Sequence, residues 1–282
     1  MKSKMKVFVV LVLLTSISFF ASAQLAITLK MSRSHYLQYE TIHAKITIRN
    51  NSGHVIVFGD NKRLQGKLLF KIIGNQNIPA DAIKNTTYPM NGIILKPGKE
   101  QEFIVPVSHF YNLKKCGTYR IYAYIEHNMF EDAYRSQETY FEVNKGFMIW
   151  KKIVGIPEFM LTKKKKTIKN RTFKLMGLLQ GKSRCHYLVI EDKRRVYSVL
   201  FLGDALGEEK ITYDIDPLSR LHMIVPISTK VFVYLVIDIN GKIDDESVYR
   251  RTKTVPSLVR DPKTGKIYVT GGTPAKKKKD YR

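Results

Sequence analysis

The stretch LKPGKEQEFIVPVSHFYNLKKCGTYRIYAYIE, residues 95–126, decides the fold class of this chain. Its second half alternates strictly, with one set of apolar side chains at Tyr119, Ile121, Ala123 and Ile125. The other set comprises Thr118, Arg120, Tyr122, Tyr124 and Glu126. A period of two over nine residues is typical of a β-strand with one buried face. The stretch therefore predicts a strand in the middle of a β-sandwich.

Short strands with the same patterning are expected throughout residues 24–145. One face of a second strand would carry Ile42, Ala44, Ile46 and Ile48. Further candidates are 25–29, 55–58, 67–73, 93–95, 102–107 and 139–143. Strands of this length and spacing are typical of an immunoglobulin-like sandwich. Tyr111 or Tyr119 would then take the structural position called the tyrosine corner.

The motifs of this region resemble those of bacterial secreted Ig-like domains. Ile46-Thr47-Ile48-Arg49-Asn50-Asn51-Ser52 is similar to their opening strand. Leu95-Lys96-Pro97-Gly98 and Gly117-Thr118-Tyr119-Arg120 are similar to their L-x-P-G and G-T-Y-R signatures. Macroglobulin-type domains and the BsuPI-type proteinase-inhibitor domain share these features. The resemblance implies a fold and leaves the function open.

Residues 1–23 have the parts of a secretory signal peptide. A lysine-containing start precedes the apolar run Val7–Phe20, and Ala21-Ser22-Ala23 forms a cleavage pattern before Gln24. The alternative is an uncleaved anchor, but the run is short for a bilayer span of about 20 residues. We expect export to the periplasm or outside the cell, with no transmembrane span left after cleavage.

Residues 146–171 break the strand pattern. Apolar clusters are split by Lys151-Lys152 and Pro157 and end in Lys163–Lys166. One interpretation is an interfacial membrane anchor with a basic flank. The favoured one is an apolar, lysine-rich connector between domains, because Gly155 and Pro157 interrupt any long amphipathic helix.

The second half, residues 172–272, shows signs of an internal repeat. The segment at 187–191, YLVIE, returns as YLVID at 234–238. Asp216-Pro217 and the strand after it return at Asp261-Pro262. A period of about 46 residues is in the range of propeller blades. We therefore predict an all-β protein whose second domain contains two blade-like units, followed by a basic tail at 273–282. Coincidence between short β segments is the alternative, and the length excludes a closed ring.

Charge is the strongest compositional signal, at 48 Lys+Arg against 24 Asp+Glu, a net charge of +24. Much of the excess lies in two blocks of four lysines, which attract polyanions electrostatically. The candidate polyanion-binding residues are Lys163, Lys164, Lys165, Lys166, Lys276, Lys277, Lys278 and Lys279. The expected partner is an anionic glycan or membrane surface, and nucleic acid is not expected after export. The bland alternative is that the lysines only keep the protein soluble.

The two cysteines, Cys116 and Cys185, are too few for a disulfide scaffold. They are either two lone thiols or one bridge between the halves.

Motifs for catalysis are missing from the sequence. It has no phosphate-binding loop, no G-x-S-x-G elbow and no histidine pair with metal-ligand spacing. We therefore predict a non-catalytic interaction module without cofactor or metal. The alternatives are a secreted enzyme acting on polysaccharide and a proteinase inhibitor that presents loop 54–66 or 74–91. The oligomeric state stays open.

Overall fold

The computed structural model describes residues 24–83, 87–157, 169–207 and 209–275. Regular structure in these ranges is β, apart from the short 3-10 turns η1 (Asn75–Asn77) and η2 (Val107–His109). The all-β prediction is confirmed. Within the same ranges, no helix has the length and apolarity needed to cross a bilayer. The expected signal peptide at 1–23 lies outside the described residues.

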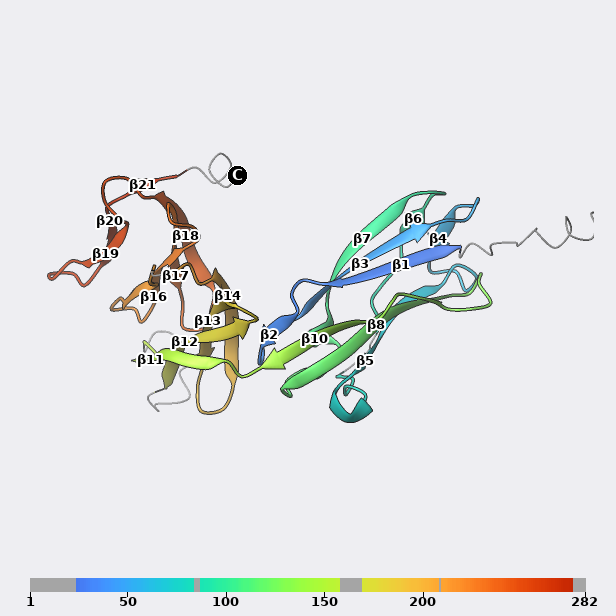
Figure 1. The fold of residues 1–282 in the computed structure, drawn as a ribbon, viewed down its shortest axis with the longest axis horizontal. Coiled ribbons are helices and arrows are strands. Elements are labelled where there is room, and N and C mark those ends of the chain that lie inside the picture. Colours follow the sequence, from blue (N-terminus) through green and yellow to red (C-terminus); the bar gives the residue numbers. More distant parts are fainter. Residues whose placement is uncertain (1–23, 84–86, 158–168, 208, 276–282) are drawn as a thin grey trace, which may run out of the picture.

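The first domain is a sandwich of two antiparallel-rich sheets (Figure 1). One sheet has the order β1 (Leu25–Met31), β3 (His43–Asn50) and β7 (Glu100–Pro106). The other has the order β2 (His35–Leu37), β10 (Thr139–Asn144), β8 (Gly117–His127) and β5 (Gly66–Ile73), with β9 (Tyr134–Arg135) beside β8. A small sheet joins β4 (Ile56–Phe58) to β6 (Ile93–Leu95).

Strand β8 provides the centre of this sandwich, as its alternation predicts. Tyr119, Ile121, Ala123 and Ile125 are buried and pack against the predicted inward residues of β3. The hydroxyl of Tyr119 donates to the backbone oxygen of Lys115, 2.7 Å away and four residues upstream. This is the geometry of a tyrosine corner. Tyr111 instead donates to the backbone oxygen of Phe70, 2.5 Å away on β5.

The second domain contains two antiparallel meanders. The first has the order β11 (Phe147–Gly155), β12 (Asn170–Gln180), β13 (Ser183–Glu191) and β14 (Val196–Asp204). The second has the order β15 (Thr212–Ile215), β16 (Leu221–Pro226), β17 (Val231–Ile237), β18 (Ile243–Arg250) and β21 (Thr273–Pro274). A hairpin of β19 (Ser257–Arg260) and β20 (Ile267–Thr270) follows β18 in sequence.

These sheets stack as layers. Phe173 and Leu188 of the first meander share a buried cluster with Met223 and Ile237 of the second. The other face of the second meander packs against the β19–β20 hairpin. The YLVI segments lie in β13 and β17, the third strand of each meander. This placement agrees with a repeat of one supersecondary unit, which stays a prediction.

The predicted connector needs correction, because residues 147–155 form strand β11 at the edge of the first meander. Lys145 and Gly146 are all that separates β10 from β11. Gly146 has φ +64°, and a Cβ there would lie 2.6 Å from the backbone oxygen of Gly177. A glycine is thus required where the chain passes between domains.

The two domains meet around Arg33, which precedes β2. Its guanidinium carbon lies 4.0 Å from the ring centroid of Phe201 and 5.6 Å from that of Tyr187, both in the second domain. Arg33 also forms an ion pair with the buried Glu40. Leu37 packs into the buried cluster of β12 and β13. We call this contact the domain joint.

Candidate functional site

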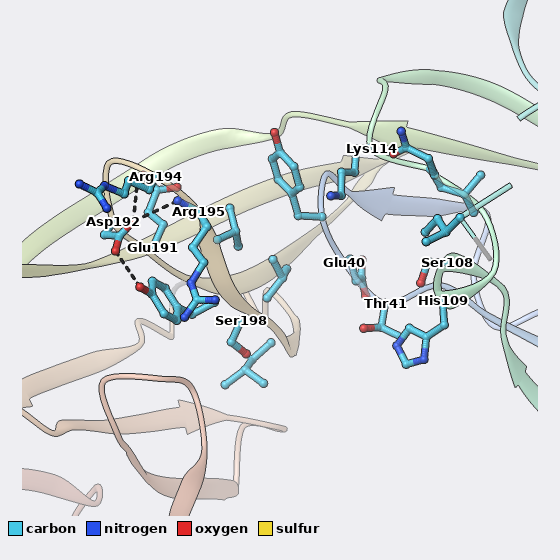
Figure 2. A pocket seen from close by; sticks show the side chains of 18 of the residues that line it. Glu40, Thr41, Ser108, His109, Lys114, Glu191, Asp192, Arg194, Arg195 and Ser198 are labelled. Atoms are coloured by element: carbon cyan, nitrogen blue, oxygen red, sulfur yellow. Dashed lines mark hydrogen bonds between the residues drawn. The ribbon is translucent and has the colours of Figure 1, made fainter. Parts of the chain in front are cut away.

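A cleft of about 730 Å³ lies beside the domain joint and is lined by both domains (Figure 2). The first domain contributes residues 39–41, Ile83, 108–109 and 111–114, and the second contributes 191–200. In Figure 2, Arg194 and Arg195 lie on one side, and Thr41, His109 and Lys114 lie on the other. A space of this size is typical of ligand sites between domains.

Asp192 organises the wall that the second domain provides. It begins the turn between β13 and β14, and its Oδ1 accepts from the backbone nitrogens of Arg194 (2.7 Å) and Arg195 (3.0 Å). Its Oδ2 accepts from the hydroxyl of Tyr197, 2.7 Å away, and from Arg171 Nη1, 3.3 Å away. The bonds from Tyr197 and the turn amides lower the pKa of Asp192 to about 2. The carboxylate therefore stays ionised and fixes the turn.

The same turn presents Lys193, Arg194 and Arg195 to the cleft. Arg195 lies over the ring of Tyr197, with its guanidinium carbon 4.2 Å from the centroid. Lys114 faces them from the first domain. None of these four cations forms a salt bridge with a carboxylate among the described residues. The cleft thus has surplus positive charge.

The wall from the first domain is polar and held by backbone contacts. Ser108 Oγ accepts from the backbone nitrogen of Ile42 at 3.0 Å, and Gln38 Nε2 donates to the backbone oxygen of Lys114 at 2.8 Å. Tyr39 is half exposed and has φ 70°. The side-chain oxygen of Asn112 is buried without a hydrogen-bond partner among the described residues.

The carboxylates of the cleft are all engaged. Glu40 pairs with Arg33 and accepts from the backbone nitrogen of Leu37 at 3.0 Å. Glu191 pairs with Lys174, and Asp192 holds its turn. A glycosidase requires a carboxylic acid that keeps its proton near neutral pH. The lowered pKa of Asp192 is the opposite property, so Asp192 does not fit the role of a glycosidase acid.

The predicted polyanion-binding residues, Lys163–Lys166 and Lys276–Lys279, lie outside the described residues. The cleft cations were missed because Lys114 and Arg194 meet only when the domains dock. A signal was nevertheless present in Glu191-Asp192-Lys193-Arg194-Arg195, an aspartate turn with three successive cations between two strand patterns.

Of the two alternatives for the cysteines, the structure has the lone thiols and not the bridge, since Cys116 and Cys185 are both free. Cys185 is buried in β13, where its Sγ lies 3.0 Å from Asp204 Oδ1. Burial, and to a smaller extent this hydrogen bond, raises the pKa of Cys185 to about 12. Cys116 is exposed on the first domain.

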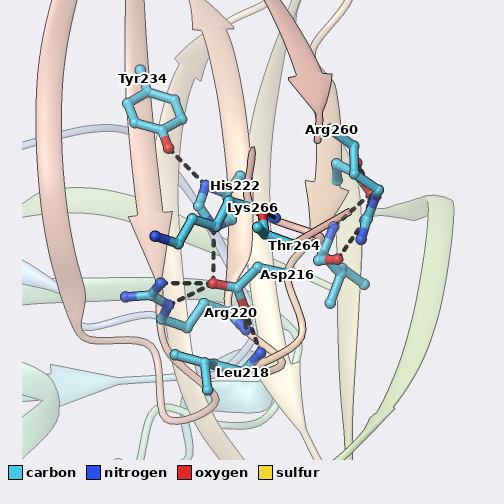
Figure 3. Close-up of polar contacts among 10 residues, drawn as sticks. Asp216, Leu218, Arg220, His222, Tyr234, Arg260, Thr264 and Lys266 are labelled. Atoms are coloured by element: carbon cyan, nitrogen blue, oxygen red, sulfur yellow. Dashed lines mark hydrogen bonds and ion pairs between the residues drawn. The ribbon is translucent and has the colours of Figure 1, made fainter. Parts of the chain in front are cut away.

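A second polar cluster lies on the second meander, beside the β19–β20 hairpin (Figure 3). His222 Nε2 lies 3.2 Å from Asp216 Oδ2, and His222 Nδ1 lies 2.6 Å from the hydroxyl of Tyr234. Burial raises the pKa of Tyr234 to about 12. Burial alone would also raise the pKa of Asp216, but bonds from Arg220 and His222 outweigh it and lower that pKa. These side chains are buried, so the cluster has a structural role in tying the turn before β16 to β17.

Residues 23–140 match the family model for the bacterial Ig-like domain. The N-terminal domain is Ig-like. This agrees with the two-sheet sandwich, whereas the likeness to BsuPI-type and macroglobulin-type domains stays a prediction. The match ends before β11, so it does not describe the second domain.

Two further comparisons add no functional information. The crystal structure of Spo0M, a sporulation control protein from Bacillus subtilis, is similar at 9% identity and a TM-score of 0.28. That likeness covers 64% of this chain and 90% of that chain, and its low score carries no conclusion. No curated protein matches the sequence significantly.

Proposed function

We propose that this chain is an exported, non-catalytic binding protein that holds an acidic glycan in the cleft between its domains. The observation that carries the proposal is the surplus of cations around the cleft. Lys193, Arg194 and Arg195 face Lys114 across a space of about 730 Å³, and the carboxylates nearby already have partners. Negative groups on a flexible ligand would complete this charge pattern.

The polar lining supports a glycan over a purely electrostatic partner. Hydroxyls of Thr41, Ser108 and Ser198 and the amide of Asn112 line the cleft beside the cations. Sugar hydroxyls both donate and accept hydrogen bonds, which this mixed lining can satisfy. The lysine blocks at 163–166 and 276–279 would add nonspecific attraction to the same ligands or to an anionic surface.

The alternatives receive less support. A polysaccharide hydrolase would need an unpaired carboxyl group in the cleft, and the three carboxylates there are engaged. A proteinase inhibitor would present a protruding loop. The described parts of segment 74–91, residues 74–83 and 87–91, are instead tied to the sandwich by β-bridges. Pro79 and Tyr88 pair with β5, and Ala82 pairs with Tyr111.

The test is binding of sulfated and uronate oligosaccharides by titration calorimetry at several salt concentrations. A Lys or Arg near a negative surface contributes about 1 kcal/mol, so Lys193→Ala with Arg194→Ala should weaken binding about thirtyfold. Parental affinity should fall steeply as salt rises. The matched control is Lys96→Ala with Lys99→Ala, which removes the same charge from an exposed turn away from the cleft.

Equal losses in the cleft variant and the control would show that net charge alone drives binding. If binding is lost only after removal of both lysine blocks, 163–166 and 276–279, the ligand is bound by those lysines and not by the cleft. Either result contradicts the proposal.

A further inference from the structure

The outer face of the five-stranded sheet in the first domain carries more aromatic surface than folding requires. In β8 the inward residues build the core, and the outward set includes Arg120, Tyr122 and Tyr124. The neighbouring strand β10 adds Tyr140, which is 59% exposed. We call the surface of Tyr122, Tyr124 and Tyr140 the tyrosine face. Solvated strand positions are usually polar, so three rings there favour a binding surface.

Strand register places the rings beside cations. Tyr140 lies opposite Arg120, and Tyr122 lies opposite Lys71 of β5. Tyr124 lies opposite Arg135 of β9. Side chains directly opposite one another on one face of a sheet are close enough to touch. Each of the three rings therefore has a cation opposite it on a neighbouring strand.

The ring contacts run diagonally to this pairing, because Arg135 lies over Tyr122, the neighbour of Tyr124 on the same face. The ring centroids of Tyr122 and Tyr124 are 6.2 Å apart, and the guanidinium carbon of Arg135 lies 4.7 Å from the centroid of Tyr122. Arg135 is exposed, and Tyr122 is half-buried. The rings therefore form a supported platform whose arginine keeps its donors available to a ligand.

One end of the platform opens into a shallow depression of about 310 Å³. Tyr140 and Arg120 line it together with the amide side chains of Asn75, Gln76 and Asn77. Gln76 and Asn77 both have φ 58°, a left-handed conformation that costs free energy in residues other than glycine. Arg120 Nη2 donates to Asn77 Oδ1 at 3.2 Å, and Asn75 Oδ1 accepts from the backbone nitrogen of Thr118 at 3.1 Å.

We propose that the tyrosine face is a second binding surface, which holds an extended acidic polysaccharide by stacking its sugar rings on the tyrosines. The C–H faces of a pyranose are apolar and fit an aromatic ring, while its hydroxyls reach the amides of the depression. Carboxylates on alternate sugars would meet the cations at the ring edges.

Charge favours an acidic chain over a neutral one. The face carries the exposed cations Lys67, Lys71 and Arg135 besides Arg120, which is itself 3.8 Å from Glu138. The other carboxylates on this side are Glu126, which lies opposite Lys67, and Glu142, which contacts His35. Lys71 and Arg135 form no ion pair among the described residues. The face lies on the first domain and shares no residue with the cleft lining. The inference therefore stands apart from the proposed function.

The experiment measures the affinity of the full chain for polygalacturonate, with dextran as the neutral comparison, by native affinity electrophoresis. Tyr140→Ala should weaken binding about tenfold, because a stacked ring contributes roughly that factor. Tyr140→Phe keeps the ring and should bind as the parent does. Tyr268→Ala is the matched control, since Tyr268 is 51% exposed on β20 of the other domain. Tyr140 is largely exposed, so its variants are expected to fold, and thermal unfolding verifies this.

The cleft variant Lys193→Ala with Arg194→Ala is run beside them to separate the two sites. Weaker binding in Tyr140→Ala but not in Tyr140→Phe supports the tyrosine face, whatever the cleft variant does. Unchanged binding in Tyr140→Ala contradicts the proposal for the tyrosine face. If binding is lost in the cleft variant alone, the tyrosine face is contradicted and the proposed function of the cleft is supported. Equal affinity for dextran and polygalacturonate contradicts the proposal that the ligand is acidic.

Discussion

Removing Arg33 should destabilise the protein by about 3 kcal/mol, because its side chain joins a buried ion pair to the rings of the opposite domain. In Arg33→Ala, Glu40 keeps one hydrogen bond, from the backbone nitrogen of Leu37, and loses its cation. Breaking a buried pair on one side costs about 3–5 kcal/mol. The Arg33 side chain is 21% exposed, which places the loss at the lower end.

Urea unfolding measures this loss in both domains. The single tryptophan of the chain, Trp150, lies in β11 and reports the second domain, while circular dichroism reports all strands. Arg33 belongs to the first domain, so a lower midpoint in Trp150 fluorescence would show that the joint stabilises its neighbour. Arg49→Ala is the control, because that arginine is exposed on β3 and its loss should change the free energy by less than about 0.5 kcal/mol.

A paired replacement tests the cause of the effect. Arg33→Met with Glu40→Gln removes both charges and should recover most of the loss, since an apolar or neutral pair of similar volume is often tolerated. A loss below about 1 kcal/mol in Arg33→Ala refutes the reasoning. A double variant no more stable than the single one shows that ring packing, and not the unpaired carboxylate, sets the free energy.

Two further outcomes follow from the buried polar groups. A thiol reagent at pH 8 should label Cys116 quickly and Cys185 only after unfolding, because Cys185 is buried and its pKa is raised to about 12. Two equally fast reactions in the native state would contradict this prediction. Asp216 has a lowered pKa, so its ionised form stabilises the fold above its unfolded pKa of about 3.9, and this contribution is lost as the pH falls through the lower folded value. Asp216→Asn should therefore show lower stability at neutral pH and a flatter acid limb than the parent in urea unfolding; an unchanged acid limb would mean that other carboxylates control it.

The first domain was predictable because its strands bury one face. In β8 and β3 every second residue is apolar, and those residues are buried as expected. Strand β2 was not predicted, since His35–Leu37 is short and pairs in parallel with β10, far away in the sequence. Neither its length nor its partner leaves a periodic signal.

Strand β11 was missed for a different reason. It is an edge strand, so Ile149, Lys151 and Ile153 are exposed and the alternation is weak. Its register also shifts between Met148 and Trp150, which moves residues from one face to the other. The cleft was beyond sequence reasoning because it depends on the angle between the domains, and only its Asp192 turn was visible locally.

The two-residue passage at Lys145-Gly146 has a consequence for how the molecule moves in solution. Independent domains on a long tether tumble separately, and each relaxes at the rate of its own mass. Here strand β10 continues almost directly into β11, and the contacts of Arg33 and Leu37 with the second domain restrain rotation about the passage. We therefore expect the two domains to share one rotational correlation time, although each half has a hydrophobic core of its own.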